Sequence, residues 1–118
     1  MVSIKDAMKF VDEKHKLDSI PSEYTVVKVE DVIDKPMNVM MFSVYHDKKN
    51  DLDKVAIGGI LADDGTKVRI HTSAIRIVEV FREIKGLLDA GQDVDFTSEK
   101  ITIKKMIVNN GVMLYLSD

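Results

Sequence analysis

The chain has 118 residues, 45% of them hydrophobic, with a formal net charge of −3 and no cysteine. This length suits one domain with a modest core, and the missing cysteines exclude a disulfide framework and thiolate-bound zinc. We therefore expect a single domain over residues 1–118, in a reducing cytoplasm and without a metal ion or other cofactor.

The first predicted element is a short amphipathic helix over residues 3–17, with Ser3 as its N-cap and Pro21 after its end. Residues 1–20 would thus form a helical extension of the domain. This stretch is charged throughout and has no uninterrupted apolar run, so we expect neither a signal peptide nor a membrane anchor. The β-branched and aromatic run that follows, residues 24–29, predicts the first strand.

Residues 37–46, "MNVMMFSVYH", predict a second strand after Pro36. Its alternation would turn Met40, Phe42 and Val44 toward the core and Met41 and Tyr45 away from it. Both sides of this strand are apolar, so one of them needs cover from elsewhere. Residues 47–53 are polar except for one leucine and predict a mobile loop.

Two strand patterns, residues 54–62 and 66–72, flank Asp64-Gly65, a pair typical of a type I′ hairpin turn. A helix is predicted to follow over residues 74–89, capped by Ser73 and stopped by Gly91. Its apolar side chains recur mostly at spacings of three and four: Ala74, Ile77, Val78, Phe81, Ile84 and Leu88.

The C-terminal third reads as strands over residues 93–96, 100–108 and 112–116, with Asn110-Gly111 as a second hairpin turn. The apolar alternation slips at Lys104 and Lys105, which predicts a β-bulge there. In the last strand, Val112, Leu114 and Leu116 would face inward and Met113 and Tyr115 outward. Phe10, Phe81 and Phe96 are expected in the core.

One helix between a third and a fourth strand is the element order of the OB-fold, a five-stranded Greek-key barrel. We therefore expect a mainly β, OB-fold-like barrel that carries the helix of residues 74–89 on its end, with an extra N-terminal helix. An SH3-like barrel, which lacks so long a helix, and an α+β sandwich are the alternatives.

The stretch "GGILADDGTKVRIHTSAIRIVEVFREI", with "VMLYLSD" at the end of the chain, resembles small single-stranded-DNA-binding proteins encoded by phages of lactic-acid bacteria. The likeness covers residues 55–118. It implies an OB-fold, oligomeric or cooperative coating of single strands in replication or recombination, no catalysis, and the host cytoplasm as location. Replication or recombination proteins become candidate partners, although the chain stops without the acidic tail through which bacterial single-strand binders recruit theirs.

The residues themselves supply a candidate binding surface. Residues 1–65 hold nine basic and thirteen acidic side chains, whereas residues 66–105 hold eight and six, so an anion-binding face belongs in the second half. Lys67, Arg69 and His71 alternate with Val68 and Ile70 and would project together, about 7 Å apart. That spacing suits successive phosphates of an extended strand, and Tyr115 would stack on a base. The alternatives are a solvated strand face and a packed tyrosine.

Four lysines and one further tyrosine extend this hypothesis. Tyr45 ends the second strand just before Lys48 and Lys49, at a loop where OB-folds bind their ligands. Lys104 and Lys105 would contact phosphates if a bulge aims them into the groove. The alternatives are a partly buried tyrosine on a flexible loop, and ordinary surface lysines.

Enzyme motifs are absent from the pattern. Asp63 and Asp64 are explained by the turn, and Ser73 near His71 sits where a helix cap is expected, without a Gly-x-Ser-x-Gly elbow. No Walker lysine follows the glycines at 58 and 59. We expect a binding protein rather than an enzyme.

A protein-binding or structural module without nucleic-acid binding is the alternative function. Seven methionines suit an adaptable apolar surface, and Met41 beside Val39 would form a homodimer patch. A homodimer or larger homo-oligomer is compatible with either function. Salt-sensitive binding of oligonucleotides discriminates between them.

Overall fold

The computed structural model describes residue 4, residues 20–95 and residues 97–118. The helix predicted over residues 3–17, which includes Phe10, lies outside the described residues except for Ile4. Phe96 also lies outside them. The elements are β1 (Thr25–Val26), the 3₁₀ helix η1 (Val29–Val32), β2 (Met37–Asp47), β3 (Leu52–Leu61), β4 (Lys67–Thr72), α2 (Ile75–Asp89), β5 (Lys100–Val108) and β6 (Gly111–Ser117).

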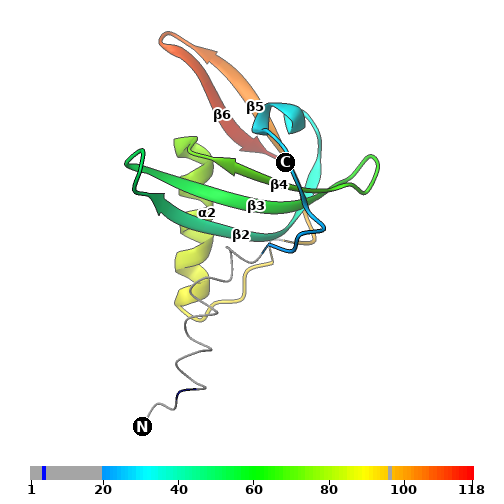
Figure 1. The fold of residues 1–118 in the computed structure, drawn as a ribbon, viewed down its shortest axis with the longest axis vertical. Helices are drawn as coiled ribbons and strands as arrows, with labels where there is room; N and C mark the ends of the chain where they lie inside the picture. The colour runs from blue at the N-terminus through cyan, green and yellow to red at the C-terminus, as the bar shows by residue number, and fades with distance from the viewer. Residues whose placement is uncertain (1–3, 5–19, 96) are drawn as a thin grey trace.

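The strands form a curled, half-barrel sheet in the order β1-β4-β3-β2-β5-β6 (Figure 1). All neighbours are antiparallel except β1, which runs parallel to β4. The mainly β class with one helix after the third long strand is confirmed. The strand count is corrected from five to six, and this sheet keeps two edges, β1 and β6, instead of closing.

The first strand is much shorter than expected. Only Thr25–Val26 pairs with β4, and Val29–Val32 turns into a 3₁₀ helix that buries Val32. The β-branched run predicts a strand as far as Val29. Packing of η1 against the core outweighs that local preference, since β propensity depends strongly on context.

Strand β2 contains a bulge that the sequence did not reveal. The pairing with β3 shifts between Val39 and Met41, so Met40 has no partner and is 38% exposed. The expectation that Met40 faces the core is therefore wrong, whereas Phe42 is buried and Val44 packs against the core. A bulge reverses the alternation by one residue, and a run that is apolar in both phases gives no sign of it.

The hairpin between β3 and β4 is confirmed, but its turn differs from the expected type. Leu61 and Thr66 close the loop through a backbone hydrogen bond of 2.9 Å, so four residues lie between them. Only Gly65 has a positive φ there, at 73°, whereas a type I′ turn requires two such residues. The Asp64 carboxylate accepts a hydrogen bond from the Thr66 amide and stabilises the loop.

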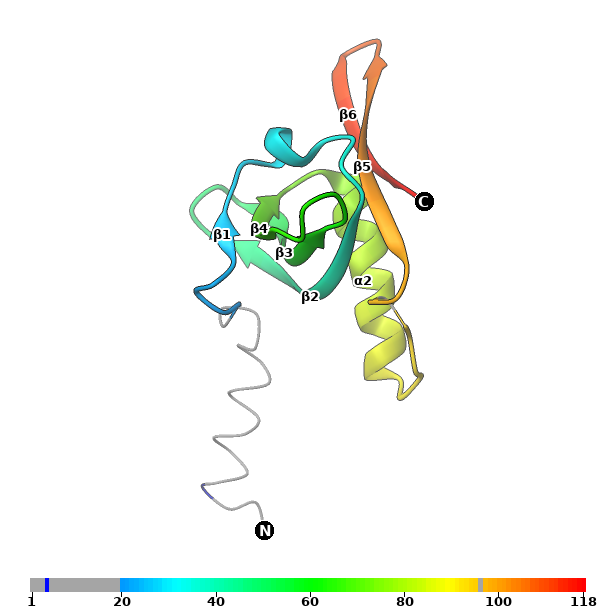
Figure 2. The same ribbon diagram turned by 90° about the vertical axis from the view of Figure 1, so that its right-hand side faces the viewer.

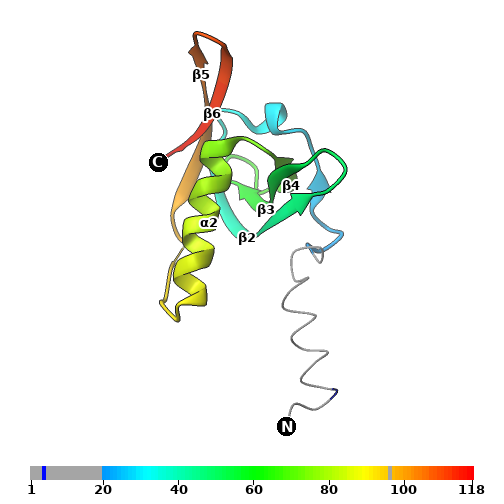
Figure 3. The same ribbon diagram turned by 90° about the vertical axis from the view of Figure 1, so that its left-hand side faces the viewer.

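Helix α2 starts one residue later than expected and without the predicted cap. Its N-cap is Ala74, and the hydroxyl of Thr72, not of Ser73, accepts the Ala74 amide at 3.1 Å. Gly91 ends the helix as predicted, with φ of 82° and its amide donated to the carbonyl of Leu88. Figures 2 and 3 show α2 beside the curled sheet and the base of the β5–β6 hairpin.

The C-terminal strands also correct two expectations. Residues 93–95 are not a strand; the carboxylate of Asp95 instead accepts the amides of Thr97 and Ser98 in a turn. The register between β5 and β6 is regular, so the bulge at Lys104 and Lys105 is wrong. The apolar pattern changes there because the distal half of the hairpin leaves the body of the protein (Figure 1).

The main core lies between the inner face of the sheet and α2. At its centre the rings of Phe42 and Phe81 lie 4.8 Å apart. The buried residues around them come from β2–β5, η1 and α2: Val32, Met37, Val39, Val55, Ile57, Leu61, Val68, Ile70, Ile77, Val78 and Ile103. Among the described residues, no helix is both long and apolar enough to cross a membrane.

Candidate nucleic-acid interface

The polar side of β4 faces away from the main core, as its alternation predicts. Val68, Ile70 and Thr72 are buried on the inner side, so Lys67, Arg69 and His71 share the outer side. Their neighbours on β3 are small or apolar, with Gly58 beside Arg69 and Ala56 beside His71. We call Lys67, Arg69 and His71 the β4 row.

The first member of the β4 row is already paired. The Lys67 ammonium lies 3.1 Å from a carboxylate oxygen of Glu23 and 5.7 Å from the centre of the Tyr24 ring. Both partners precede β1, more than forty residues away in sequence. An exposed pair of this kind contributes little to stability, so phosphate could displace Glu23 at modest cost.

Arg69 has no such partner. Its Nε atom is buried and lacks a hydrogen-bond acceptor, and no carboxylate within the described part of the chain forms an ion pair with it. A buried polar atom without a partner costs free energy, typically about 1–3 kcal/mol. Arg69 is therefore a cation that the described part of the fold leaves without an anion.

His71 is held by Tyr45 from β2. The Tyr45 hydroxyl and His71 Nδ1 are 3.0 Å apart, and the two rings meet edge to face at 6.1 Å. Burial, with smaller contributions from Arg69 and Lys54, lowers the pKa of His71 below 6.5. A neutral His71 hydrogen-bonded to a tyrosine presents aromatic surface rather than charge.

A small second core covers part of this outer side. Ile20, Tyr24 and Ala56 are buried together, and Met41 and Tyr45 pack against them. Met41 and Tyr45 do point away from the main core as expected, but the chain itself covers Met41. Since Val39 is buried in the main core, the expected homodimer patch of Met41 and Val39 does not exist as a free surface.

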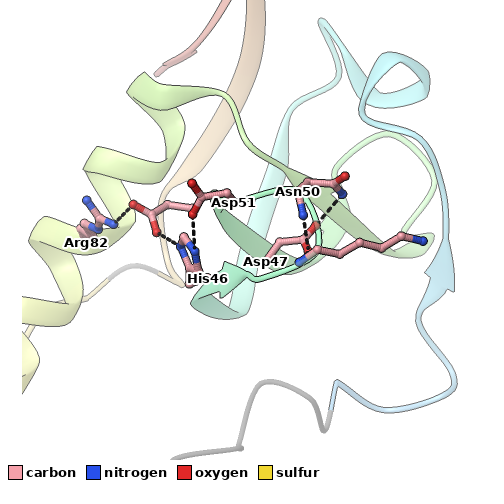
Figure 4. A network of polar contacts seen from close by, with 7 residues as sticks. His46, Asp47, Asn50, Asp51 and Arg82 are labelled. Carbon is pink, nitrogen blue, oxygen red and sulfur yellow. Dashed lines mark hydrogen bonds and ion pairs between the residues drawn. The ribbon is translucent and has the colours of Figure 1, made fainter.

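The loop after β2 is shorter than the sequence suggested, and hydrogen bonds hold it. Strand β2 continues through Asp47 and β3 begins at Leu52, which leaves residues 48–51 as the loop. The Asp47 carboxylate accepts hydrogen bonds from the amides of Lys49 and Asn50 (Figure 4). It also pairs with Lys54 at 3.0 Å. Lys54 first, and then Asn50, lower the pKa of Asp47 to about 2.

Lys48 and Lys49 lie on this loop with exposed side chains that form no ion pair among the described residues. Lys54, which sequence reasoning missed, stands beside Tyr45 on the outer side of β3. The alternation of β3 could have identified it, because Val55 and Ile57 point inward. The outer side of β2–β4 thus carries Lys54, Lys67 and Arg69 as cations.

His46, near the end of β2, belongs to a cluster of polar contacts that connects the loop after β2 to helix α2. Its Nδ1 lies 2.9 Å from Asp53 and its Nε2 lies 3.1 Å from Asp51, while Asp53 also pairs with Arg82 of α2 (Figure 4). Asp53 first, with Asp51, raises the pKa of His46 above 6.5. Sequence reasoning missed this cluster, since its members are brought together by the hairpin and by helix packing.

Tyr115, Lys104 and Lys105 lie on the β5–β6 hairpin. Lys104 and Tyr115 are opposite one another, and Lys104 pairs with Asp34 at 3.2 Å. Lys105 is exposed. Strands β3, β2 and β5 stand between β4 and β6 in the sheet, so the strand order does not bring Tyr115 next to the β4 row.

A groove that the sequence did not indicate lies where β4 passes into α2. Its volume is about 540 Å³, and residues 72–76 form one wall. Val108 and residues 112–114 of the β5–β6 hairpin form the other wall. The side chains of Ser73 and Arg76 are exposed and form no hydrogen bond or ion pair with the described residues.

Comparisons with known proteins identify no relative of this chain. The chain matches no protein-family model, no curated protein and no solved structure. Within the described residues, no cluster of three or more histidine, cysteine, aspartate or glutamate side chains could hold a metal ion.

Proposed function

We propose that this protein binds single-stranded DNA without sequence preference, through the outer side of β3 and β4. We also propose that the fold is an OB-fold. Strands β2, β3 and β4, helix α2, and strands β5 and β6 follow the element order of an OB-fold, with β1 as an addition alongside β4. The corresponding strand face is where OB-folds bind oligonucleotides.

The observation that carries the proposal is Arg69. A phosphate oxygen would supply the anion that the Arg69 guanidinium lacks, since no carboxylate of the described residues forms an ion pair with it. Lys67 and Lys54 flank it on the same side, and Tyr45 with His71 offers aromatic surface for a base. These groups combine the phosphate contacts and stacking that sequence-independent binding uses.

The overall charge limits how such binding works. With a net charge of −3, the protein cannot attract DNA through a diffuse positive field. A few positioned cations must therefore dominate the affinity, and each should be visible in the salt dependence. Coating and protection of single strands in replication or recombination is the biological role that we propose for this activity.

The test is the substitution Arg69→Met. Methionine keeps the unbranched stem and places a methyl group where Nε stands, so the buried unsatisfied nitrogen disappears. We expect the free energy of unfolding to rise by up to about 1 kcal/mol. The slope of log affinity against log salt for a thymidine oligonucleotide should fall in magnitude by about 0.7, the value of one phosphate contact on a single strand.

The matched control is Lys100→Met, which removes the same charge from an exposed position at the start of β5. It should leave the affinity and the salt slope close to those of the parent. Fluorescence anisotropy at several salt concentrations and chemical denaturation measure both quantities. Equal binding by the parent and by a folded Arg69→Met variant would show that the β4 row is not the interface.

A second candidate function, interaction between copies of the protein, rests on a different part of the molecule. The far end of the β5–β6 hairpin exposes Ile107 by 85%, Val112 by 57% and Met106 by 41%. An exposed apolar patch on a protruding arm is typical of a contact surface. Association through this arm is compatible with DNA binding by the β4 row.

A further inference from the structure

We infer that the groove between residues 72–76 and the β5–β6 hairpin holds the next nucleotides of the same single strand that the β4 row binds. This inference rests on the proposed function and extends its site from the strand face around the start of α2. The occupant is a nucleobase with its adjoining phosphate. Three features of the described residues support it.

The first feature is continuity. The outward positions of β4 are spaced by about 7 Å, and Ser73, two residues after His71 and just past the end of β4, is exposed and lines the groove. Ser73 directly follows the last residue of β4, so the groove opens at the end of the strand that carries the β4 row. From Lys67 to Ser73 the path is about 20 Å long.

The second feature is charge. Arg76 lines the groove, and no acidic residue is among the residues that form its walls. Arg76 forms no ion pair with the described residues, and Glu79, one turn further along α2, does not line the groove. The groove thus offers a free guanidinium to an anion, next to the hydroxyl of Ser73.

The third feature is the apolar surface of the two walls. Ile75 is 72% exposed at the start of α2, and Val112 faces the groove from the hairpin. Apolar surface beside a cation suits a base and its phosphate, since aliphatic side chains can pack against the face of any base. A groove of about 540 Å³ has room for such a unit.

The experiment compares thymidine oligonucleotides of about four and about twelve nucleotides, the lower and middle part of the range for one OB-fold. For the longer oligonucleotide, Arg76→Ala should weaken binding by about tenfold and reduce the salt slope by about 0.7. For the shorter one, which the β4 row accommodates alone, the loss should stay within about twofold. Lys100→Ala is the control and should change neither.

A pair of substitutions of opposite charge at one position of the groove wall tests whether an anion lies in the groove. Val112 is exposed, so Val112→Glu and Val112→Lys should both fold. Val112→Glu should weaken binding of the longer oligonucleotide and Val112→Lys should strengthen it. If Arg69→Met weakens binding while Arg76→Ala and both Val112 variants leave it unchanged, the groove inference is overturned and the proposed function stands. If the parent binds neither oligonucleotide, both fail.

Discussion

At the scale of single residues, the two described histidines respond to their surroundings in opposite ways. His46 lies between Asp51 and Asp53, which favour its protonated form and raise its pKa. Burial beside Arg69 and Lys54 favours the neutral form of His71 and lowers its pKa. Both effects originate in contacts among β2, β3, β4 and the loop between β2 and β3.

These shifts predict how stability depends on pH. The contribution of His46 is complete below its ordinary pKa of 6.5 and is lost as the pH rises through its raised value. The contribution of His71 is present above 6.5 and is lost as the pH falls through its lowered value. These two groups together favour maximum stability near pH 6.5.

Thermal unfolding of the parent, His46→Gln and His71→Gln across pH 5 to 8.5 checks this prediction. His46→Gln should reduce the decline of the unfolding midpoint on the alkaline side, and His71→Gln should reduce it on the acid side. NMR titration of each imidazole gives the pKa values directly. An unchanged alkaline decline in His46→Gln would contradict the contribution assigned to the Asp51 and Asp53 contacts.

The side-chain surface of β4 illustrates what a sequence reveals at this scale. Strict alternation correctly placed Lys67, Arg69 and His71 on one side, because a period of two is a local property of the strand. Their partners were not predictable. Glu23 and Tyr45 reach the row only through the path of the chain before β1 and the pairing of β2 with β3.

At the scale of elements, two glycines show how the same substitution acts in opposite directions. A Cβ atom on Gly59 would lie 2.9 Å from Sδ of the fully buried Met37 and 3.2 Å from the carbonyl oxygen of Asn38. A Cβ atom on Gly86, inside α2, would meet nothing within 4 Å. The first position requires glycine for packing, whereas the second does not.

We therefore expect Gly59→Ala to lower the free energy of unfolding by about 1–3 kcal/mol, the usual cost of overpacking. Gly86→Ala should raise it by about 0.5–1 kcal/mol, since alanine is the better helix former. Urea denaturation of both variants measures the two values. Equal stability of Gly59→Ala and the parent would mean that Met37 moves aside without loss.

Periodicity and turn residues predicted which segments form hairpins and the helix. They did not predict irregularities within those elements. The hairpins, the helix and its stop at Gly91 are marked by local chemistry that acts within a few residues. The bulge after Val39 lies in a run that is apolar in both phases, so alternation carries no information there. At Lys104, the slip of the pattern marks where the hairpin leaves the core.

At the scale of the whole molecule, the β5–β6 hairpin is an arm attached to a curled sheet (Figure 1). Strand β5 pairs with β2 only at Met37 and Asn38, and beyond that point the described pairing of the hairpin is mostly within itself. Strand β6 is an edge that carries no charged residue, proline or bulge. Natural proteins normally protect such edges with one of these devices.

The arm should therefore mediate association between copies of the protein. We expect sedimentation to show a concentration-dependent increase in mass for the parent, and Ile107→Lys to shift it toward the monomer, because a charge at an 85% exposed apolar position opposes contact between arms. Amide hydrogen exchange locates the contact: residues 104–113 should exchange quickly in dilute solution and become protected as the concentration rises. Leu52→Lys, on an apolar residue exposed at the start of β3, is the control for added charge and should leave the mass unchanged. A parent that stays monomeric at high micromolar concentration, with the arm equally exchangeable throughout, would leave the β4 row and the groove as the only proposed contact surfaces.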